Sequence, residues 1–263
     1  MKKKNNIYNI LLVVFALIFV VSSFFLGKEL IQRRQAAEYL TAIQSEYIPK
    51  IPVFLNTDSK HNNTGDSEDA PPIKAERVEP VNPTIHQLVE EYPDVIGWLT
   101  VEGANVNHPF VQADDNATYL WSDLNREYIN GGTLFMDYFN ERDFSDKLTI
   151  IYGHNMRNGT MFGQLANFLD FDYLLENPDV YISLPYSTEH YTIAACLVVD
   201  GADNVIYDRI GEKEDMQEVV DFIYANTQVN PDTPLDADSD ILVLSTCNRT
   251  FDLARTLLIC IPD

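Results

Sequence analysis

Short apolar runs separated by turn residues fill most of the chain after residue 94, and this pattern constrains the fold more than any other feature of the sequence. The runs are rich in β-branched and aromatic residues, which is typical of strands. Their number and close spacing indicate a mainly β protein, either a barrel or a sandwich. The eight runs cover residues 95–101, 106–112, 133–136, 148–152, 180–184, 190–199, 241–246 and 255–261.

Two stretches with helical spacing interrupt these runs, and a further short helix is expected over residues 84–91, ahead of Pro93. In each of the two interrupting stretches, the apolar residues recur three or four positions apart, so that they share one face of a helix. The sequence therefore predicts helical insertions in the β fold. The apolar positions are Met161, Phe162, Leu165 and Phe168 in the first stretch, and Met216, Val219, Val220 and Ile223 in the second.

The amino terminus contains a long apolar stretch. Three lysines precede residues 5–27, which carry no charge, and residues 10–26 consist mostly of Leu, Val, Ile and Phe. A bilayer core requires about 20 such residues, so one membrane span is predicted. A cleaved signal peptide is the alternative, but the stretch is long and no clear Ala-x-Ala site follows it. Lys28, Arg33 and Arg34 flank the far side, which makes the charge bias less decisive for orientation.

The composition after this stretch suggests how the chain is divided. Residues 29–47 have a helical pattern, and residues 56–83 are rich in Asn, Asp, Ser, Glu and Pro, as in flexible linkers. We therefore expect a tail and transmembrane anchor over residues 1–28, and a helical stalk with a linker over 29–81. A folded domain is expected over 82–263. With 46% hydrophobic residues, the chain can bury one good core.

The net charge of −22 argues against one class of partner. Asp and Glu number 40, against 18 Lys and Arg. Proteins that bind nucleic acid neutralise phosphates with clustered basic residues. Nucleic acid is therefore not an expected partner, and a solvated acidic surface is the common explanation for such a charge.

A thiol, an imidazole and a guanidinium each lie where a strand-like run meets a loop. Cys247 follows the run 241–246, Arg255 begins the next run, and the run 148–152 leads into His154. If the last two runs form an antiparallel hairpin, Cys247 and Arg255 face each other across its mouth. A neighbouring cation favours the thiolate, an imidazole can protonate a leaving amine, and a guanidinium stabilises an oxyanion. The trio predicts acyl transfer through a thioester.

Each of these residue types also has an ordinary structural interpretation. A lone loop histidine often satisfies a turn, and Arg249 is a rival guanidinium only two positions from the thiol. We expect Arg249 in the solvated loop, with a substrate contact left open. Cys196 and Cys260 lie in apolar runs, where small buried core residues are expected, although a disulfide between them stays open. No His or Cys pair shows zinc-ligand spacing, so no metal site is expected.

Together, the motifs resemble those of the class B sortases, membrane-anchored cysteine transpeptidases of Gram-positive bacteria. The resemblance rests on Leu244-Ser-Thr-Cys247, on Arg255 eight positions later and on Tyr152-Gly-His-Asn-Met156, and it covers the last two thirds of the chain. It implies a sortase-like, eight-stranded β-barrel with helical insertions and N-terminal helices. It also implies Cys247, His154 and Arg255 as the catalytic residues, and no cofactor.

Substrate-binding positions follow from the same resemblance. Asn116 and Leu120 of the segment Asn116-Ala-Thr-Tyr-Leu120 match residues that line the substrate groove, as do Tyr152, Ser245 and Thr246. Leu120 and Tyr152 are equally well explained as core residues.

The resemblance further implies a reaction and a location. The enzyme would cleave a carboxy-terminal sorting motif of a secreted protein through a thioacyl enzyme and join the threonine carboxyl to an amine of a cell-wall precursor or of a pilin. Its amino terminus would be cytoplasmic and its catalytic domain extracellular. Two alternatives remain: a cysteine endopeptidase that passes the thioester to water, and a non-catalytic, membrane-tethered module that binds the cell wall.

Overall fold

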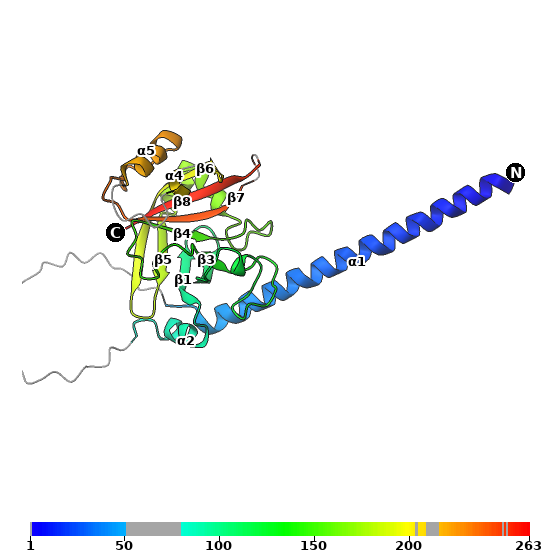
Figure 1. Cartoon of the computed structure of the whole chain (residues 1–263), viewed down its shortest axis with the longest axis horizontal. Coiled ribbons are helices and arrows are strands. Elements are labelled where there is room, and N and C mark those ends of the chain that lie inside the picture. Colours follow the sequence, from blue (N-terminus) through cyan, green and yellow to red (C-terminus); the bar gives the residue numbers. More distant parts are fainter. Residues whose placement is uncertain (1, 51–79, 203–204, 209–215, 249, 251) are drawn as a thin grey trace, which may run out of the picture.

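The computed structural model describes residues 2–50, 80–202, 205–208, 216–248, 250 and 252–263. In this part of the chain, eight strands close into a barrel in the order β1-β2-β3-β4-β7-β8-β6-β5 (Figure 1). The predicted mainly β fold is confirmed, and the choice between barrel and sandwich is settled in favour of the barrel. The strands are β1 (Val95–Val101), β2 (Val106–Val111), β3 (Leu134–Met136), β4 (Leu148–Tyr152), β5 (Asp179–Ser183), β6 (Thr188–Asp200), β7 (Ile241–Cys247) and β8 (Ala254–Pro262).

Parallel pairing between two strands far apart in the sequence decides which loops meet. Most strands that follow one another, such as β5 and β6 or β7 and β8, pair antiparallel, whereas β2 and β3 pair in parallel. The distant strands β4 and β7 also pair in parallel, with Tyr152 opposite Ser245. Parallel neighbours end at the same edge of a sheet, and here that edge carries the segments after Tyr152 and after Ser245.

Both faces of β7 are buried, which explains its unbroken apolar sequence. Leu242 and Leu244 point into the barrel, whereas Ile241 and Val243 belong to a second cluster on its outer face. The helix α5 (Gln217–Asn226) covers this outer cluster with Val219, Val220 and Ile223, as their spacing predicted.

The first helical insertion differs from the prediction. Met161 has a φ of 51°, which a helix does not allow, and a Cβ atom on Gly163 would lie 2.2 Å from the carbonyl oxygen of Met156. Regular structure therefore begins later, as the 3-10 helix η2 (Leu165–Leu169) and the helix α3 (Phe171–Glu176). The four apolar residues of this stretch are all buried: Met161, Phe162, Leu165 and Phe168. Their spacing thus correctly indicated buried positions, but the prediction of one continuous helix was wrong.

The amino-terminal helix α1 (Lys2–Tyr47) continues without a break through the predicted span and the predicted stalk. Its first half is long and apolar enough to cross a membrane, and its apolar side chains are exposed, with Phe15 at 70% and Phe19 at 73%. Its second half does not stand clear of the domain, because Ile43 and Tyr47 are buried in a cluster with Trp98 of β1. The helix α2 (Pro83–Glu91) contacts α1 (Figure 1).

Most of the predicted linker, residues 56–79, lies outside the described part of the chain. The domain boundaries at residues 28 and 82 therefore stay predictions.

The two cysteines of the apolar runs are core residues. Cys196 on β6 and Cys260 on β8 are both buried and free, so the disulfide left open by the sequence is not formed. Burial raises the pKa of Cys196 to about 12, which keeps its thiol protonated at neutral pH. Cys247 is the exposed cysteine of the three.

Candidate active site

A pocket of about 270 Å³ at the ends of β4 and β7 brings together all eight residues that the sequence predicted for catalysis and substrate binding. A larger hollow of about 630 Å³, beside α3 and β6, contains none of them. Because the eight residues come from separate parts of the chain, their convergence depends on the barrel. They are Asn116, Leu120, Tyr152, His154, Ser245, Thr246, Cys247 and Arg255, and Phe135 and Gly153 complete the lining.

Cys247 and Arg255 lie opposite each other in the register of β7 and β8. Directly opposed residues of an antiparallel pair project from the same face, so thiol and guanidinium share the pocket. Cys247 is exposed. In the described part of the chain, the guanidinium of Arg255 donates to two backbone carbonyls, Leu253 at 3.3 Å and Ala254 at 3.2 Å. Neither carbonyl neutralises the charge, which stays available to an oxyanion. Arg249, the rival cation, lies outside the described residues.

His154 is held on the other side of the pocket. Its Nε2 atom lies 2.8 Å from the carbonyl oxygen of Leu120. Because a carbonyl only accepts hydrogen bonds, Nε2 carries a proton, and Nδ1 is the atom left to exchange one with a substrate. The ring of Trp121 packs on the imidazole with a centroid distance of 4.4 Å. Burial lowers the pKa of His154, while the hydrogen bond to Leu120 acts in the opposite direction.

Hydrogen bonds between the ends of β4 and β7 join the histidine loop to the cysteine strand. The Thr246 hydroxyl donates to the carbonyl of Gly153 at 2.6 Å, and the amide of Asn155 donates to the carbonyl of Cys247 at 2.7 Å. These bonds set the position of His154 relative to Cys247. Thr246 is thus engaged in the frame of the site. Asn155 was not predicted, although it directly follows the histidine.

Asp137 organises the floor of the pocket and was also not predicted. It directly follows β3 and is 2% exposed. Its Oδ2 atom accepts from the Asn116 amide and from the Tyr152 hydroxyl, both at 2.8 Å, and its Oδ1 accepts from the N–H of Phe139 at 2.9 Å. One buried carboxylate therefore orients two pocket residues. A carboxylate directly after a strand was the signal in the sequence that could have indicated it.

Tyr207 supports the pocket from behind. It lies on α4 (Val205–Asp208), a single helical turn that the sequence pattern did not predict. Its hydroxyl is 2.7 Å from the Ser245 Oγ, and its ring stacks on Tyr152 at 6.5 Å. Burial raises the pKa of Tyr207, so it remains a neutral hydrogen-bonding group. Tyr152 and Leu120 line the pocket and also pack against the core. The interpretations of these two residues as pocket residues and as core residues therefore both apply in part.

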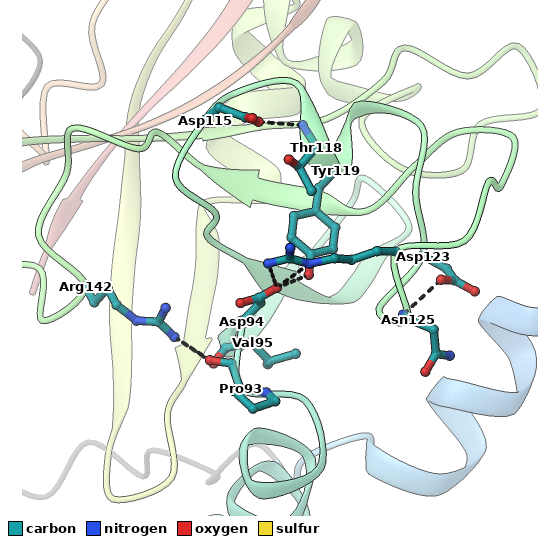
Figure 2. Close-up of polar contacts among 10 residues, drawn as sticks. Pro93, Asp94, Val95, Asp115, Thr118, Tyr119, Asp123, Asn125 and Arg142 are labelled. Carbon is teal, nitrogen blue, oxygen red and sulfur yellow. Dashed lines mark hydrogen bonds and ion pairs between the residues drawn. The ribbon is translucent and has the colours of Figure 1, made fainter.

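An ion pair at Asp94 holds the segment that carries Leu120 (Figure 2). Its carboxylate accepts a hydrogen bond from the Tyr119 hydroxyl and pairs with Arg126, with 2.7 Å between Oδ2 and Nη2. Burial favours the neutral acid, but the hydrogen bonds from Tyr119 and Arg126 outweigh it and lower the pKa of Asp94. The carboxylate therefore stays charged at neutral pH and anchors Tyr119, which precedes Leu120.

Asp115 starts the short 3-10 helix η1 (Thr118–Leu120). Its carboxylate accepts from the N–H groups of Ala117 at 2.8 Å and Thr118 at 2.7 Å (Figure 2 draws the second contact). These hydrogen bonds lower the pKa of Asp115, as expected for a carboxylate that satisfies free N–H groups. The helix ends at Leu120, whose carbonyl faces His154.

The site supplies a nucleophile, a proton donor and a fixed cation around one pocket. This combination suits attack on a carbonyl carbon. The cation can stabilise the oxyanion that forms, and the proton donor can neutralise the leaving group. In the described part of the chain, no group of three His, Cys, Asp or Glu residues is placed to hold a metal ion.

Comparison with known proteins finds sortases. No family model matches the chain. Sortase B of Listeria monocytogenes is 29% identical over 177 residues, which are 66% of this chain and 71% of that protein. A class B sortase of Streptococcus pyogenes involved in pilus biogenesis superposes with a TM-score of 0.62 at 27% identity, covering 68% of this chain and 97% of that one. The substrate complex of Staphylococcus aureus sortase B gives 0.61 at 25% identity, covering 69% and 85%.

Proposed function

Because the chain is a class B sortase, a cysteine transpeptidase, we propose that it cleaves a carboxy-terminal sorting motif of secreted proteins and transfers the motif's threonine carboxyl to an amine. The observation that carries the proposal is that Cys247, His154 and Arg255 line the same pocket. The Staphylococcus aureus relative, solved as a complex with a substrate, supports the proposal that this chain also binds a substrate.

In the first half-reaction, the sulfur of Cys247 bonds to the threonine carbonyl carbon, and the carbonyl electrons move to its oxygen. The guanidinium of Arg255, opposite Cys247 in the hairpin, stabilises this oxyanion. When the oxyanion collapses, the carbon–nitrogen bond breaks, and His154 gives a proton to the leaving amine. A thioacyl enzyme remains.

In the second half-reaction, an acceptor amine attacks the thioester. His154, now neutral, takes the proton of that amine, and the sulfur of Cys247 leaves as thiolate. The acceptor is an amine of a cell-wall precursor or of a pilin. The Streptococcus pyogenes relative, which is involved in pilus biogenesis, supports including the pilin.

The proposed chemistry requires a thiolate and an imidazolium at the same time. Because burial lowers the pKa of His154, its imidazolium form is scarce at neutral pH. The fraction of the enzyme in the competent state is therefore limited by this imidazolium form.

We further propose that α1 anchors the enzyme in the cell membrane, with the amino terminus cytoplasmic and the barrel extracellular. The support is the exposed apolar first half of the helix. An exposed surface of this kind is stable in lipid and not in water.

The test uses the full chain in detergent, because α1 packs on the barrel. The protein is incubated with a library of sorting-motif peptides and candidate amines, and intact mass and products are compared with Cys247→Ala. A thioacyl adduct that passes to an amine and is absent in the variant is the expected result. An adduct resolved only by water would indicate an endopeptidase. A folded protein that forms no adduct with any peptide would indicate a binding module.

A further inference from the structure

The loop that follows His154 lies against α1 just beyond the apolar part of that helix. A cleft of about 160 Å³ separates them, lined by Glu29 and Arg33 of α1 and by Asn155, Arg157 and Asn158 of the loop. Figure 1 shows the free half of α1 leaving the barrel on the side of the loops between β2 and β5. The loop after His154, which belongs to the active-site end of the barrel, therefore lies just beyond the proposed membrane span.

The contact between α1 and the barrel is fixed by specific hydrogen bonds. The N–H of Leu124 donates to the Tyr39 hydroxyl at 3.1 Å, and the Gln44 amide donates to the carbonyl of Asn107 at 2.9 Å. Because α1 is one uninterrupted helix, these bonds also set the distance between the barrel and the span. A rigid connection of this kind holds the domain at one height above the bilayer.

That height places the loop at the lipid headgroups. The apolar stretch ends at Leu26, and the loop meets the helix at Glu29 and Arg33. At a rise of 1.5 Å per residue, the contact lies about 4 to 11 Å beyond the last apolar residue. The headgroup layer of one leaflet is about 5 to 8 Å thick. Leu30 and Ile31 are exposed and extend the apolar surface further toward the barrel.

The charges at this level are basic, although the protein as a whole carries −22. Lys28, Arg33, Arg34 and Arg157 stand against Glu29 and Glu38, which form ion pairs with Arg33 and Arg34 at 2.5 and 2.8 Å, so that two positive charges remain. In the described part of the chain, Arg157 is exposed and forms no ion pair. An anionic bilayer repels an acidic surface and attracts clustered basic residues. The level of α1 that carries these residues is therefore the one that such a bilayer accepts.

We propose that a membrane-facing patch, defined as Lys28, Arg33, Arg34 and Arg157, binds anionic lipid headgroups of the membrane that α1 crosses. The inference rests on the proposed anchoring by α1. Because the neighbouring Asn155 donates to the carbonyl of Cys247, the patch adjoins the active site directly. The pocket consequently opens at the bilayer surface, toward substrates held in the membrane.

The experiment measures the depth of introduced tryptophans in the full chain, reconstituted in vesicles of phosphatidylglycerol and phosphatidylcholine, after subtraction of the signal of the Trp121→Phe background. Of the two native tryptophans, Trp98 is fully buried, and Trp121→Phe removes the exposed one. In that background, Asn158→Trp reports on the loop. Asn130→Trp, in the segment that lines the same cleft, serves as a second reporter, because the Asn158 side chain also accepts hydrogen bonds from Thr160.

Two further reporters mark the extremes. Phe15→Trp lies in the proposed span. Tyr186→Trp lies in the turn between β5 and β6 and contacts His86 of α2, near the far end of α1. That end is about 30 Å along the helix from the end of the apolar stretch. Lipids with a nitroxide on the headgroup should quench positions 158 and 130 at least twice as strongly as position 186. Lipids with a nitroxide deep in the acyl chain should quench position 15.

Quenching at position 15 without headgroup quenching at 158 and 130 would overturn the proposal while leaving the anchoring intact. Absence of quenching at position 15 would overturn the anchoring and the patch together. Neither result bears on the chemistry at Cys247, which the peptide assay tests separately.

A charge reversal tests the lipid specificity. Headgroup quenching at position 158 should be stronger in vesicles with phosphatidylglycerol than in pure phosphatidylcholine. Arg157→Glu should remove that difference, whereas Lys50→Glu, an exposed position after α1, should retain it. Equal quenching in both lipids for the unaltered patch would contradict anionic headgroups as the partner.

Discussion

On the floor of the pocket the polar side chains are tied to one another, whereas at its rim the reactive groups are tied to the backbone. Asp137 binds both Asn116 and Tyr152 on the floor. At the rim, by contrast, Arg255 donates to two carbonyls and His154 to a third. Side-chain networks fix the shape of a site, and backbone carbonyls orient a cation without cancelling its charge. The floor is thus built to hold a substrate, and the rim keeps its charges available for chemistry.

Removing the thiol should have the largest effect on activity and almost none on stability. We expect Cys247→Ala to lower thioacyl formation by at least about 10³-fold, because the other two thiols, of Cys196 and Cys260, are buried. The side chain is exposed, so the free energy of unfolding should change by less than about 0.5 kcal/mol. Intact mass and urea unfolding measure the two quantities. A large loss of stability would show that the rim is part of the structural frame.

Substitution of Arg255 tests whether a positive charge alone is sufficient to stabilise the oxyanion at the rim of the pocket. We expect Arg255→Ala to lower kcat by about 10² to 10³-fold, as for other oxyanion donors. Arg255→Lys should recover only part of this loss, because an ammonium lacks the planar fork of the guanidinium. Steady-state kinetics with the best peptide measure both variants. Full activity of either variant would exclude the assigned role.

Asp137→Asn should affect the floor and leave the chemistry at the rim intact. Asn116 and Tyr152 donate to Oδ2 of Asp137, and the N–H of Phe139 donates to Oδ1. An amide has only one acceptor oxygen, so it cannot satisfy both sides, and the orientation of the floor is disturbed. We expect KM to rise about 10-fold, kcat to change little, and the unfolding free energy to fall by about 1 to 3 kcal/mol. A fall in kcat with unchanged KM would place Asp137 in the chemistry and contradict the comparison between floor and rim.

Trp121 should give the smallest effect, through the pKa of His154. Burial lowers that pKa, and Trp121, itself 46% exposed, packs on the ring. Trp121→Ala should therefore raise the pKa of His154 toward its ordinary value, which NMR titration measures. A raised pKa increases the imidazolium fraction at neutral pH and moves the pH optimum upward, with a change in kcat/KM below about five-fold. A lowered pKa would show that ring stacking outweighs desolvation.

The sequence alone determined the local features of this protein. Alternation and apolar runs predicted all eight strands, because the residues of a strand themselves indicate which of its faces can be buried. The positions of Cys247 and Arg255 at the two sides of a hairpin mouth were also predictable, because a hairpin joins neighbours in the sequence. The motif around His154 and Cys247 indicated the family for the same reason: it is carried by short contiguous segments.

The tertiary structure decided what depends on contacts between distant segments. The register between β4 and β7 brings Asn155 to Cys247 across 92 positions, and the fold brings Asn116 and Tyr152 onto Asp137. Closure into a barrel, the turn at Met161 and the packing of α1 on the barrel were likewise not readable from periodicity. Periodicity reports which face of an element is buried, but the partner that buries it is chosen by the packing of the whole chain.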